Sequence, residues 1–387
     1  MEHIDVSTLA GMRMVCDCGR THEVPIKKII TGKDALGRLP EMLSEFKGAK
    51  VVLVGDSNTM PLARKPVIEA LNAAGCEVCE HTFTKDELLL DEWLIGSMLI
   101  HMPSQPGLIV AIGSGTMNDL CRVIGARCGV PYIIIGTAPS MDGYASVTSA
   151  VMVDGLKTSV PLSVPYGILT DIDLMLTAPD EMLSAGVGDI LGKYVALNDW
   201  QLAARETGEC FCPYIADMMS DAVGRCVAGI PQIATRDSEM IQALTDTLVM
   251  SGVAISMHGQ SRPAAGSEHQ LAHCWESAGH HIPGGARLHG NYVAFGTEIA
   301  CRLYELAGEE YDLKFSYRMP APHEIRDYMK ALGGFSTIEA LGITRELLWE
   351  SFMHATSNKR FTLIAMLEAH GKLERYAKRI ADEYFPG

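Results

Sequence analysis

The segment GLIVAIGSGT, residues 107–116, decides the class of fold that this sequence predicts. Its first six residues are apolar or small and lead into a glycine-containing turn, which is typical of a buried strand that runs into a helix. A helix is expected over about residues 117–127. The segment therefore predicts one strand–turn–helix unit of a parallel sheet.

The same pattern occurs on both sides of this segment. Upstream, KVVLVG at 50–55 reads as a buried strand, with the polar turn DSNT at 56–59 and a helical segment through 64–74. Downstream, VPYIII at 130–135 predicts a third strand that ends in GTAPS at 136–140. Parallel sheets bind ligands beyond the carboxyl ends of their strands. We therefore expect a Rossmann-like α/β domain whose polar turns face a common ligand.

The pattern of apolar residues changes twice after this region. Between about residues 146 and 176, the alternating runs SAVMVDG and VPYGILTDIDLML predict an added hairpin or edge strands. From Pro179 onward strand-like runs give way to amphipathic stretches at 189–205, 238–257, 266–278, 291–307 and 360–384. We therefore predict an α/β domain over 1–178, an all-α domain over 179–387, and an active site in the cleft between them.

Composition limits the classes of protein to which the chain can belong. With 387 residues, 48% of them hydrophobic, the chain can form a soluble two-domain protein. Its net charge of −15 argues against nucleic acid and anionic membranes as partners, because both require a basic surface. No apolar run approaches the roughly 20 residues of a membrane-spanning helix, and the first residues lack the pattern of an export signal. We therefore expect a cytoplasmic protein without membrane insertion.

The eleven cysteines allow two interpretations, reduced thiols or a structural metal site. Three pairs lie close in the sequence without repeating as a zinc-ribbon motif: Cys16/Cys18, Cys76/Cys79 and Cys210/Cys212. An odd number of cysteines in a long chain without an export signal favours thiols over disulfides. We therefore expect free thiols and treat structural zinc as the less favoured alternative.

The glycine-rich turn at 113–116 lies where a phosphate group would bind. Glycines let backbone N–H groups approach an anion, and the helix that follows adds the positive end of its dipole. The alternative is a tight connection without a ligand. Asp56 directly follows a strand, a position from which a carboxylate can accept hydrogen bonds from an adenosine ribose. Asp56 or Ser57 could equally cap the next helix, so both interpretations stay open.

The second half of the chain contains residues of the types that bind divalent metals. Asp189 lies at the start of a predicted helix, His269 and His273 are four residues apart on another, and His289 follows in LHGN. Two imidazoles and a carboxylate form an open three-ligand site. The alternatives are a helix cap for Asp189 and a structural pair for the histidines. A further pair, HH at 280–281, is expected on a loop surface.

These pieces, in this order, resemble the superfamily of iron-containing alcohol dehydrogenases, glycerol dehydrogenases and dehydroquinate synthases, and most closely its glycerol-1-phosphate dehydrogenase branch. The resemblance spans about residues 25–310. It rests on GSGTMND (113–119), GTAPSMDGYAS (136–146), AGVGDILGKYVALNDW (185–200), SRPAAGSEHQLAHCWE (261–276) and LHGNYVAFGT (288–297). The chain departs from the superfamily at Ser114, where a glycine is usual, but a serine there still offers its backbone N–H.

The resemblance implies metal-dependent, reversible reduction of dihydroxyacetone phosphate to sn-glycerol-1-phosphate with NAD(H) or NADP(H), in a homodimer or larger homo-oligomer. It implies that Asp189, His269 and His289 hold one divalent metal, with zinc or nickel favoured. Substrate contacts are implied for Asp142, Asp189 and His273, with His273 as proton donor or relay and Asp142 orienting the substrate hydroxyls. The implied cofactor contacts are Asp56, Gly113, Gly115, Thr116, Met117, Asn118, Asp119, Thr137, Ala138, Pro139, Ser140 and Ser146.

Two cations within the metal-site motifs, Lys193 and Arg262, are predicted to bind the substrate phosphate, which needs donors that glycerol does not. Three alternatives stay open: a dehydrogenase of unphosphorylated polyols, a lyase of the dehydroquinate synthase kind, and a metal- or nucleotide-binding module without catalysis. Asp56 would repel a 2′-phosphate, which favours NAD, but neighbouring groups can offset one carboxylate. We therefore expect use of both NAD and NADP.

Overall fold

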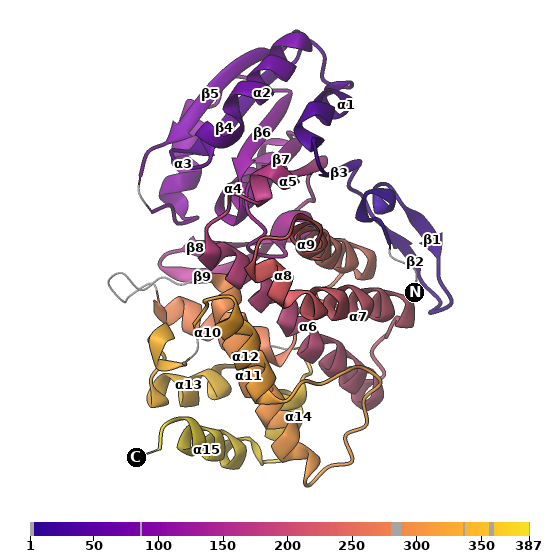
Figure 1. Cartoon of the computed structure of the whole chain (residues 1–387), viewed down its shortest axis with the longest axis vertical. Coiled ribbons are helices and arrows are strands. Elements are labelled where there is room, and N and C mark those ends of the chain that lie inside the picture. The colour runs from indigo at the N-terminus through magenta and orange to yellow at the C-terminus, as the bar shows by residue number, and fades with distance from the viewer. Residues whose placement is uncertain (1–3, 86, 280–287, 336, 356–359, 387) are drawn as a thin grey trace.

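The N-terminal half of the chain is built on a six-stranded parallel sheet, and the C-terminal half is helical (Figure 1). This arrangement is seen in a computed structural model that describes residues 4–85, 87–279, 288–335, 337–355 and 360–386. The predicted loop histidines at 280–281 lie outside these residues. The expected fold class, a parallel α/β domain followed by a helical one, is confirmed.

The sheet has the strand order β3-β10-β7-β6-β4-β5, and all neighbouring strands are parallel. The central strands β6 and β7 are buried along their whole length, as expected where helices cover both faces of a parallel sheet. The strands are β3 Lys28–Gly32, β4 Lys50–Asp56, β5 Glu77–Phe83, β6 Leu108–Gly113, β7 Tyr132–Gly136 and β10 Gly167–Asp171.

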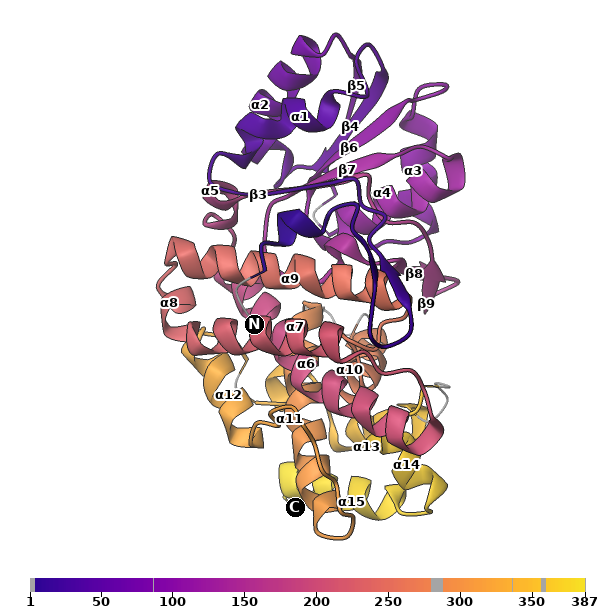
Figure 2. The same cartoon turned by 90° about the vertical axis from the view of Figure 1, so that its right-hand side faces the viewer.

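Helices pack on the two faces of this sheet (Figure 2). Helices α1 (Leu39–Leu43) and α2 (Met60–Ala73) cover one face, whereas α3 (Glu92–His101) and α4 (Gly115–Cys128) cover the other. The three predicted strand–turn units correspond to β4–α2, β6–α4 and β7. Their polar turns therefore lie on the same side of the sheet, at the carboxyl ends of its strands.

One expectation for residues 146–176 is wrong. SAVMVDG contributes to a hairpin, β8 Thr148–Val153 with β9 Leu156–Pro161. The following run does not form an edge, because β10 lies inside the sheet between β3 and β7 and is buried at every residue. Its partner β3 lies more than 130 residues earlier in the chain, so no local pattern could reveal the pairing.

Within the described residues, the chain beyond β10 contains helices and connections but no strand. The predicted stretches correspond to α6, α9, α10 and α11, whereas 360–384 is divided at Gly371, which adopts a φ of 65°. The helices are α5 Ile172–Met175, α6 Asp180–Thr207, α7 Pro213–Ala228, α8 Ile230–Ala234, α9 Ser238–His258, α10 Ser267–Gly279, α11 His289–Gly308, α12 Pro322–Ala331, α13 Arg345–Ala355, α14 Leu363–Ala369 and α15 Leu373–Tyr384.

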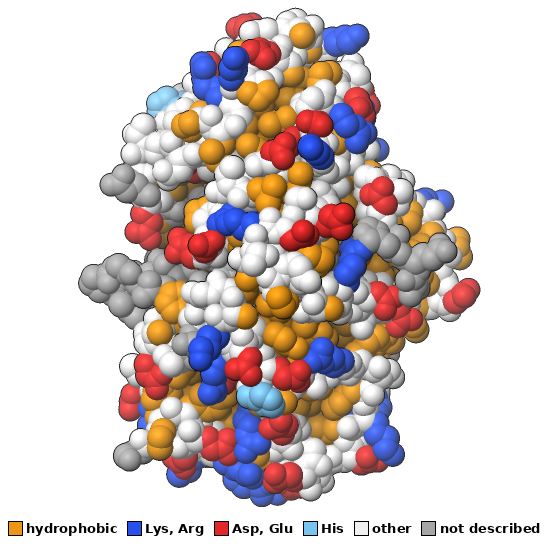
Figure 3. All heavy atoms as spheres, viewed as in Figure 1, with side chains coloured by type: hydrophobic (Ala, Val, Ile, Leu, Met, Phe, Trp, Pro, Cys, Tyr) orange, Lys and Arg blue, Asp and Glu red, His pale blue; other side chains and the backbone are white. Residues whose placement is uncertain are grey.

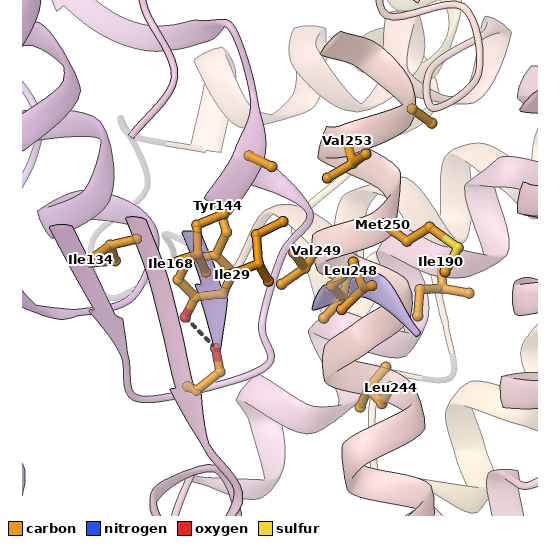
Figure 4. Packing of buried hydrophobic residues seen from close by; sticks show 14 of the residues in the cluster. Ile29, Ile134, Tyr144, Ile168, Ile190, Leu244, Leu248, Val249, Met250 and Val253 are labelled. Carbon is orange, nitrogen blue, oxygen red and sulfur yellow. Dashed lines mark hydrogen bonds between the residues drawn. The ribbon is translucent and has the colours of Figure 1, made fainter. Parts of the chain in front are cut away.

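Helix α9 joins the two halves through a continuous apolar core. It is long and apolar enough to cross a membrane by length and composition alone, but 83% of its most apolar window is buried inside the protein. Val249 of α9 lies beside Ile29 of the α/β half, whereas Leu248 lies toward Ile190 of α6 (Figure 4). We therefore regard α9 as a core helix. The predicted domain boundary at 178/179, which falls between α5 and α6, stays a proposal.

The surface carries charges of both signs. On the face shown in Figure 3, acidic and basic side chains are interspersed over both halves. Such mixing is typical of soluble proteins.

Candidate active site

A cavity of about 1390 Å³ lies between the α/β half and the helical half. Its walls include Gly115 and Thr116 after β6, the loop residue Asp142, hairpin β8–β9, and His273 of α10. Pockets for a single small ligand measure about 300–1000 Å³. The cavity is therefore large enough for a dinucleotide and a small substrate together.

The three predicted metal ligands come together at the wall of this cavity, and His269 and His289 line it. The ligand atoms of Asp189 on α6, His269 on α10 and His289 on α11 all lie within 4.8 Å of one another. His269 Nε2 is 3.6 Å from Asp189 Oδ1, and the two histidine ring centroids are 5.2 Å apart. A carboxylate and two imidazoles at this spacing could hold a divalent cation and leave coordination positions open.

Glycines let the helices that carry these ligands approach backbone to backbone. A Cβ atom on Gly290 of α11 would lie 1.7 Å from the carbonyl oxygen of Ala185 on α6. A Cβ atom on Gly188 would lie 2.2 Å from the carbonyl oxygen of Gly290. These two glycines are the neighbours of His289 and Asp189 in the sequence. The close contact between α6 and α11 therefore sets the separation of the two ligands.

Asp189 is fully buried in a network of charges. Lys193 Nζ lies 2.6 Å from Asp189 Oδ1 and 2.8 Å from Asp142 Oδ2. The backbone N–H of Asp142 donates to Asp189 Oδ2 at 2.9 Å, and Ser251 donates to Asp142 Oδ2 at 2.8 Å. Although burial alone raises the pKa of Asp189, Lys193 and the nearby histidines hold it well below its ordinary value. Asp189 is therefore present as a carboxylate.

Lys193 does not fit its predicted role as a phosphate contact. Its side chain is fully buried between two carboxylates and is absent from the cavity lining. Arg262 does not fit either, because its Nε lies 2.6 Å from Glu209 Oε1 and one terminal nitrogen donates to the carbonyl oxygen of Phe361. Both cations form ion pairs with carboxylates inside the fold. Their predicted contact with the substrate phosphate therefore has no support in the structure.

Two glutamates on α10 orient the histidines, and sequence reasoning missed both. Glu268 Oε1 lies 2.7 Å from His269 Nδ1, and Glu276 Oε1 lies 2.7 Å from His289 Nδ1. Each carboxylate accepts a hydrogen bond from the Nδ1–H group, which leaves Nε2 as the ligand atom. Although burial alone lowers the pKa of His269, hydrogen bonds with Asp189 and Glu268 raise it to about 9. The one local sign of their role in the sequence is that both glutamates lie on the helix that carries His269 and His273.

Replacing Glu276 with glutamine is expected to weaken metal binding by about 10- to 100-fold, the usual effect of changing a group that orients a metal-binding histidine. Glu276 also binds Lys157 Nζ at 2.5 Å, so the substitution removes the charge that holds both groups. Metal affinity measured by competition with a chromophoric chelator tests this, with the exposed Glu346→Gln on α13 as the control. Equal affinities for the two variants would contradict the role of Glu276.

His273 lies on the cavity wall outside the cluster of Asp189, His269 and His289. Its ring centroid is 5.9 Å from those of both His269 and His289. His273 is exposed to the cavity, and the surrounding protein lowers the pKa of its ring because it desolvates the charged form. A neutral imidazole can accept or relay a proton. A second group, His273, Glu276 and His289, is also close enough to hold a cation.

Apart from Asp56, the predicted cofactor residues divide into two groups. Gly115, Thr116, Asp119 and Ser146 line the cavity. The others sit behind this wall, where they are buried at the ends of β6 and β7: Gly113, Met117, Asn118, Thr137, Ala138, Pro139 and Ser140. Asn118, for example, donates from Nδ2 to the carbonyl oxygen of Gly143 at 2.9 Å. Direct cofactor contact by this second group stays a prediction.

Asp56 acts as a cap of its own turn. Its Oδ1 accepts hydrogen bonds from the backbone N–H groups of Asn58 and Thr59, at 2.8 and 2.9 Å. It is absent from the residues that line the cavity. The N-cap residue of α2 is Thr59, so neither Asp56 nor Ser57 caps the helix as the alternative interpretation expected. The ribose contact of Asp56 stays a prediction.

Arg360 is a cavity residue that sequence reasoning missed. Its guanidinium donates to the carbonyl oxygen of Ala265 at 2.8 Å and to Ser261. All three residues line the same cavity as His269. Arg360 lies almost 100 residues from the motif that it joins, so only the tertiary structure brings them together.

Comparisons with known proteins agree with this architecture. Residues 30–179 match the family of iron-containing alcohol dehydrogenases. The glycerol-1-phosphate dehydrogenase [NAD(P)+] of Halalkalibacterium halodurans is 36% identical over 295 residues, which cover 75% of this chain and 74% of the relative. The enzyme of the same name from Geobacillus stearothermophilus is 28% identical over 91% of this chain and 95% of its own length.

Solved structures share the fold at lower sequence identity. Glycerol dehydrogenase from Schizosaccharomyces pombe aligns with a TM-score of 0.68 at 19% identity, covering 92% of this chain and 90% of its own. Maleylacetate reductase from Rhizobium sp. aligns with a TM-score of 0.70 at 16% identity, covering 94% and 97%. With the fold, the cavity and the relative of 36% identity in agreement, the chain belongs to the glycerol-1-phosphate dehydrogenase family of the iron-containing alcohol dehydrogenases.

Proposed function

We propose that this protein is a metal-dependent glycerol-1-phosphate dehydrogenase that reversibly reduces dihydroxyacetone phosphate to sn-glycerol-1-phosphate with NADH or NADPH. The observation that carries the proposal is the cluster of Asp189, His269 and His289, whose two histidines line the same cavity as the turn at Gly115 and Thr116. This arrangement supports a metal site and a phosphate-binding turn facing one space.

The proposed reaction needs a bound metal and a bound cofactor, together with side chains of the protein. A divalent cation would polarise the substrate carbonyl, and the nicotinamide would supply the hydride. Asp189 contributes negative charge and is kept ionised by Lys193. Asp142, held by Lys193 and Ser251, presents a carboxylate to the cavity that can accept hydrogen bonds from substrate hydroxyls. We further propose zinc or nickel as the metal, and at least a homodimer as the assembly.

His273 is proposed to pass the proton to the product oxygen. A His273→Gln variant should lose about 10²- to 10⁴-fold in kcat, the usual contribution of a side chain that transfers a proton in the transition state. Its metal content should stay unchanged, because the three ligands of the proposed metal site are intact. Steady-state kinetics and elemental analysis of the same sample test both points. Loss of the metal together with activity would instead make His273 a ligand, in the alternative group with Glu276 and His289.

Arg360 is proposed to bind the substrate phosphate. An Arg360→Ala variant should raise KM for dihydroxyacetone phosphate by about 10- to 100-fold, since one charged hydrogen bond contributes about 1.5–3 kcal/mol. KM for unphosphorylated dihydroxyacetone should not change. Arg262→Ala provides the comparison, because Arg262 pairs with Glu209 away from the cavity lining. A phosphate-specific increase in KM for Arg262→Ala alone would return the role to Arg262.

The reaction class can be tested on the purified protein stripped with a chelator. NADH and NADPH absorbance would be followed with dihydroxyacetone phosphate or dihydroxyacetone, after zinc, nickel, iron or manganese is added back separately. Metal-dependent oxidation that prefers the phosphorylated ketone is expected. Activity with only the unphosphorylated ketone would indicate a polyol dehydrogenase, and no cofactor oxidation with any metal would overturn the proposal.

A further inference from the structure

The N-terminal hairpin packs against the helical half, on α9 and close to α7 (Figure 2). Its strands, β1 Arg13–Val15 and β2 Thr21–Glu23, have only three residues each. Isolated two-stranded hairpins are marginally stable, so such a short one needs further support. The described residues that line the active-site cavity include none from this hairpin. The hairpin therefore has a fixed position that the proposed reaction does not explain.

Four metal-binding side chains converge where this hairpin meets α7. The ligand atoms of Cys16, Cys18, His22 and Cys212 all lie within 4.8 Å of one another. Cys16 Sγ is 3.6 Å from Cys212 Sγ, and His22 Nε2 is 3.4 Å from Cys18 Sγ and 3.3 Å from Cys212 Sγ. A tetrahedral zinc site with bonds of about 2.3 Å to sulfur and 2.0–2.1 Å to nitrogen has edges of about 3.8 and 3.6 Å. The observed separations agree with this geometry within about 0.3 Å.

The orientation of His22 favours a metal ligand. Its ring is fully buried, and Nδ1 lies 2.8 Å from the carbonyl oxygen of Met257 on α9. A carbonyl can only accept, so Nδ1 must carry the proton. In the neutral ring Nε2 then has a free lone pair, directed at the sulfurs of Cys18 and Cys212. A backbone carbonyl that holds the non-ligating nitrogen is a common feature of metal-bound histidines.

The local backbone brings the sulfurs to one side. The backbone N–H of Gly19 donates to the carbonyl oxygen of Cys16 at 2.9 Å, and that of Cys16 donates to Arg20. Gly19 adopts a φ of 84°, which a residue with a side chain would rarely accept. Cys212 is the N-cap of the 16-residue helix α7. The cluster therefore combines a tight turn with a helix start about 190 residues away.

From these contacts we propose that Cys16, Cys18, His22 and Cys212 bind a structural zinc ion that fastens the N-terminal hairpin to α7 and α9. Three thiolates and one imidazole complete a tetrahedron, so no coordination position remains for a substrate. Binding would release one proton from each thiol. A disulfide between Cys16 and Cys212 would use only two of the four groups. The structure contains all eleven cysteines as free thiols. The proposal concerns only Cys16, Cys18 and Cys212, whose grouping no local sequence pattern indicates, because Cys212 lies far along the chain and its close neighbour Cys210 is not one of the four groups.

The test measures zinc in the full-length chain, purified with a thiol reductant from zinc-supplemented cells. The His289→Ala background removes a ligand of the active-site metal, so the metal that remains reports on the hairpin site. One zinc ion per chain should remain there. It should be lost when Cys212→Ser is added, and it should remain when Cys210→Ser is added as the matched control.

Cobalt substitution of the otherwise wild-type protein gives a second readout that does not depend on how well the serine variant folds. Cobalt bound at this site should show a thiolate-to-cobalt charge-transfer band, which the oxygen and nitrogen ligands of Asp189, His269 and His289 cannot produce. Absence of that band, absence of zinc from the His289→Ala protein, or a Cys16–Cys212 disulfide in the reduced preparation would overturn the proposal. None of these readouts depends on the catalytic activity of the protein.

Discussion

Replacing His289 with alanine is expected to remove the active-site metal and to lower kcat/KM for dihydroxyacetone phosphate by about 10³-fold or more. His289 is one of three proposed ligands, and its loss also leaves the Glu276 carboxylate without its imidazole partner. Stabilisation of a developing alkoxide by a cation contributes several kcal/mol, and about 4 kcal/mol corresponds to about 10³-fold. Elemental analysis and initial rates measured with the metal supplied in excess test both parts of the prediction.

A matched control for this substitution is His323→Ala. His323 is an exposed histidine on α12 and does not line the cavity, so the variant should keep its metal and its rate. Full activity of His289→Ala without added metal would reject the assignment of His289. Rescue by excess metal alone would show that His289 tightens metal binding but is dispensable for the chemistry.

Replacing Gly290 with alanine is expected to destabilise the protein and to impair metal binding together. The added Cβ atom would lie 1.7 Å from the carbonyl oxygen of Ala185, far inside van der Waals contact, so α6 and α11 must move apart. Overpacking of a well-packed contact costs about 1–3 kcal/mol, occasionally more. Asp189 and His289 sit on these helices beside the contact, so the same movement separates two ligands. Urea denaturation and metal affinity test the prediction.

Gly224→Ala is the control for this second substitution. Gly224 lies inside α7, and a Cβ atom there would meet no atom within 4 Å. The same chemical change should therefore stabilise the protein by about 0.5–1 kcal/mol, because alanine favours the helix over glycine. An unchanged unfolding midpoint for Gly290→Ala would mean that the two helices do not need close contact.

Segments with a strong local apolar pattern were predicted well. The strands β4, β6 and β7 are continuous apolar runs that end in polar turns, and the long helices α9 and α11 have clear periodicity. Strand β5 was missed because it is an edge strand with exposed Glu77 and Glu80, so no apolar run marks it. Strand β10 was misplaced because its position depends on β3, far away in the sequence.

The candidate sites show the same difference between what local motifs predict and what long-range contacts decide. Asp189, His269 and His289 lie in short motifs, so their residue types could be recognised before their geometry was known. The partners of charged groups could not be recognised in this way, because a sequence does not say whether a cation faces solvent, a ligand or a buried carboxylate. Lys193 and Arg262 were therefore assigned to phosphate, although each is held by a carboxylate inside the fold.

Periodicity and short motifs are enough to predict the parallel α/β class, the helical second half and the residue types of the proposed active-site metal cluster. Which groups meet depends on the tertiary structure. It brought Glu276 to His289, Arg360 to the cavity, and Cys212 to the turn at Cys16. Such contacts join residues from distant parts of the chain, and they form only when buried apolar surfaces and glycine contacts have set the positions of whole helices.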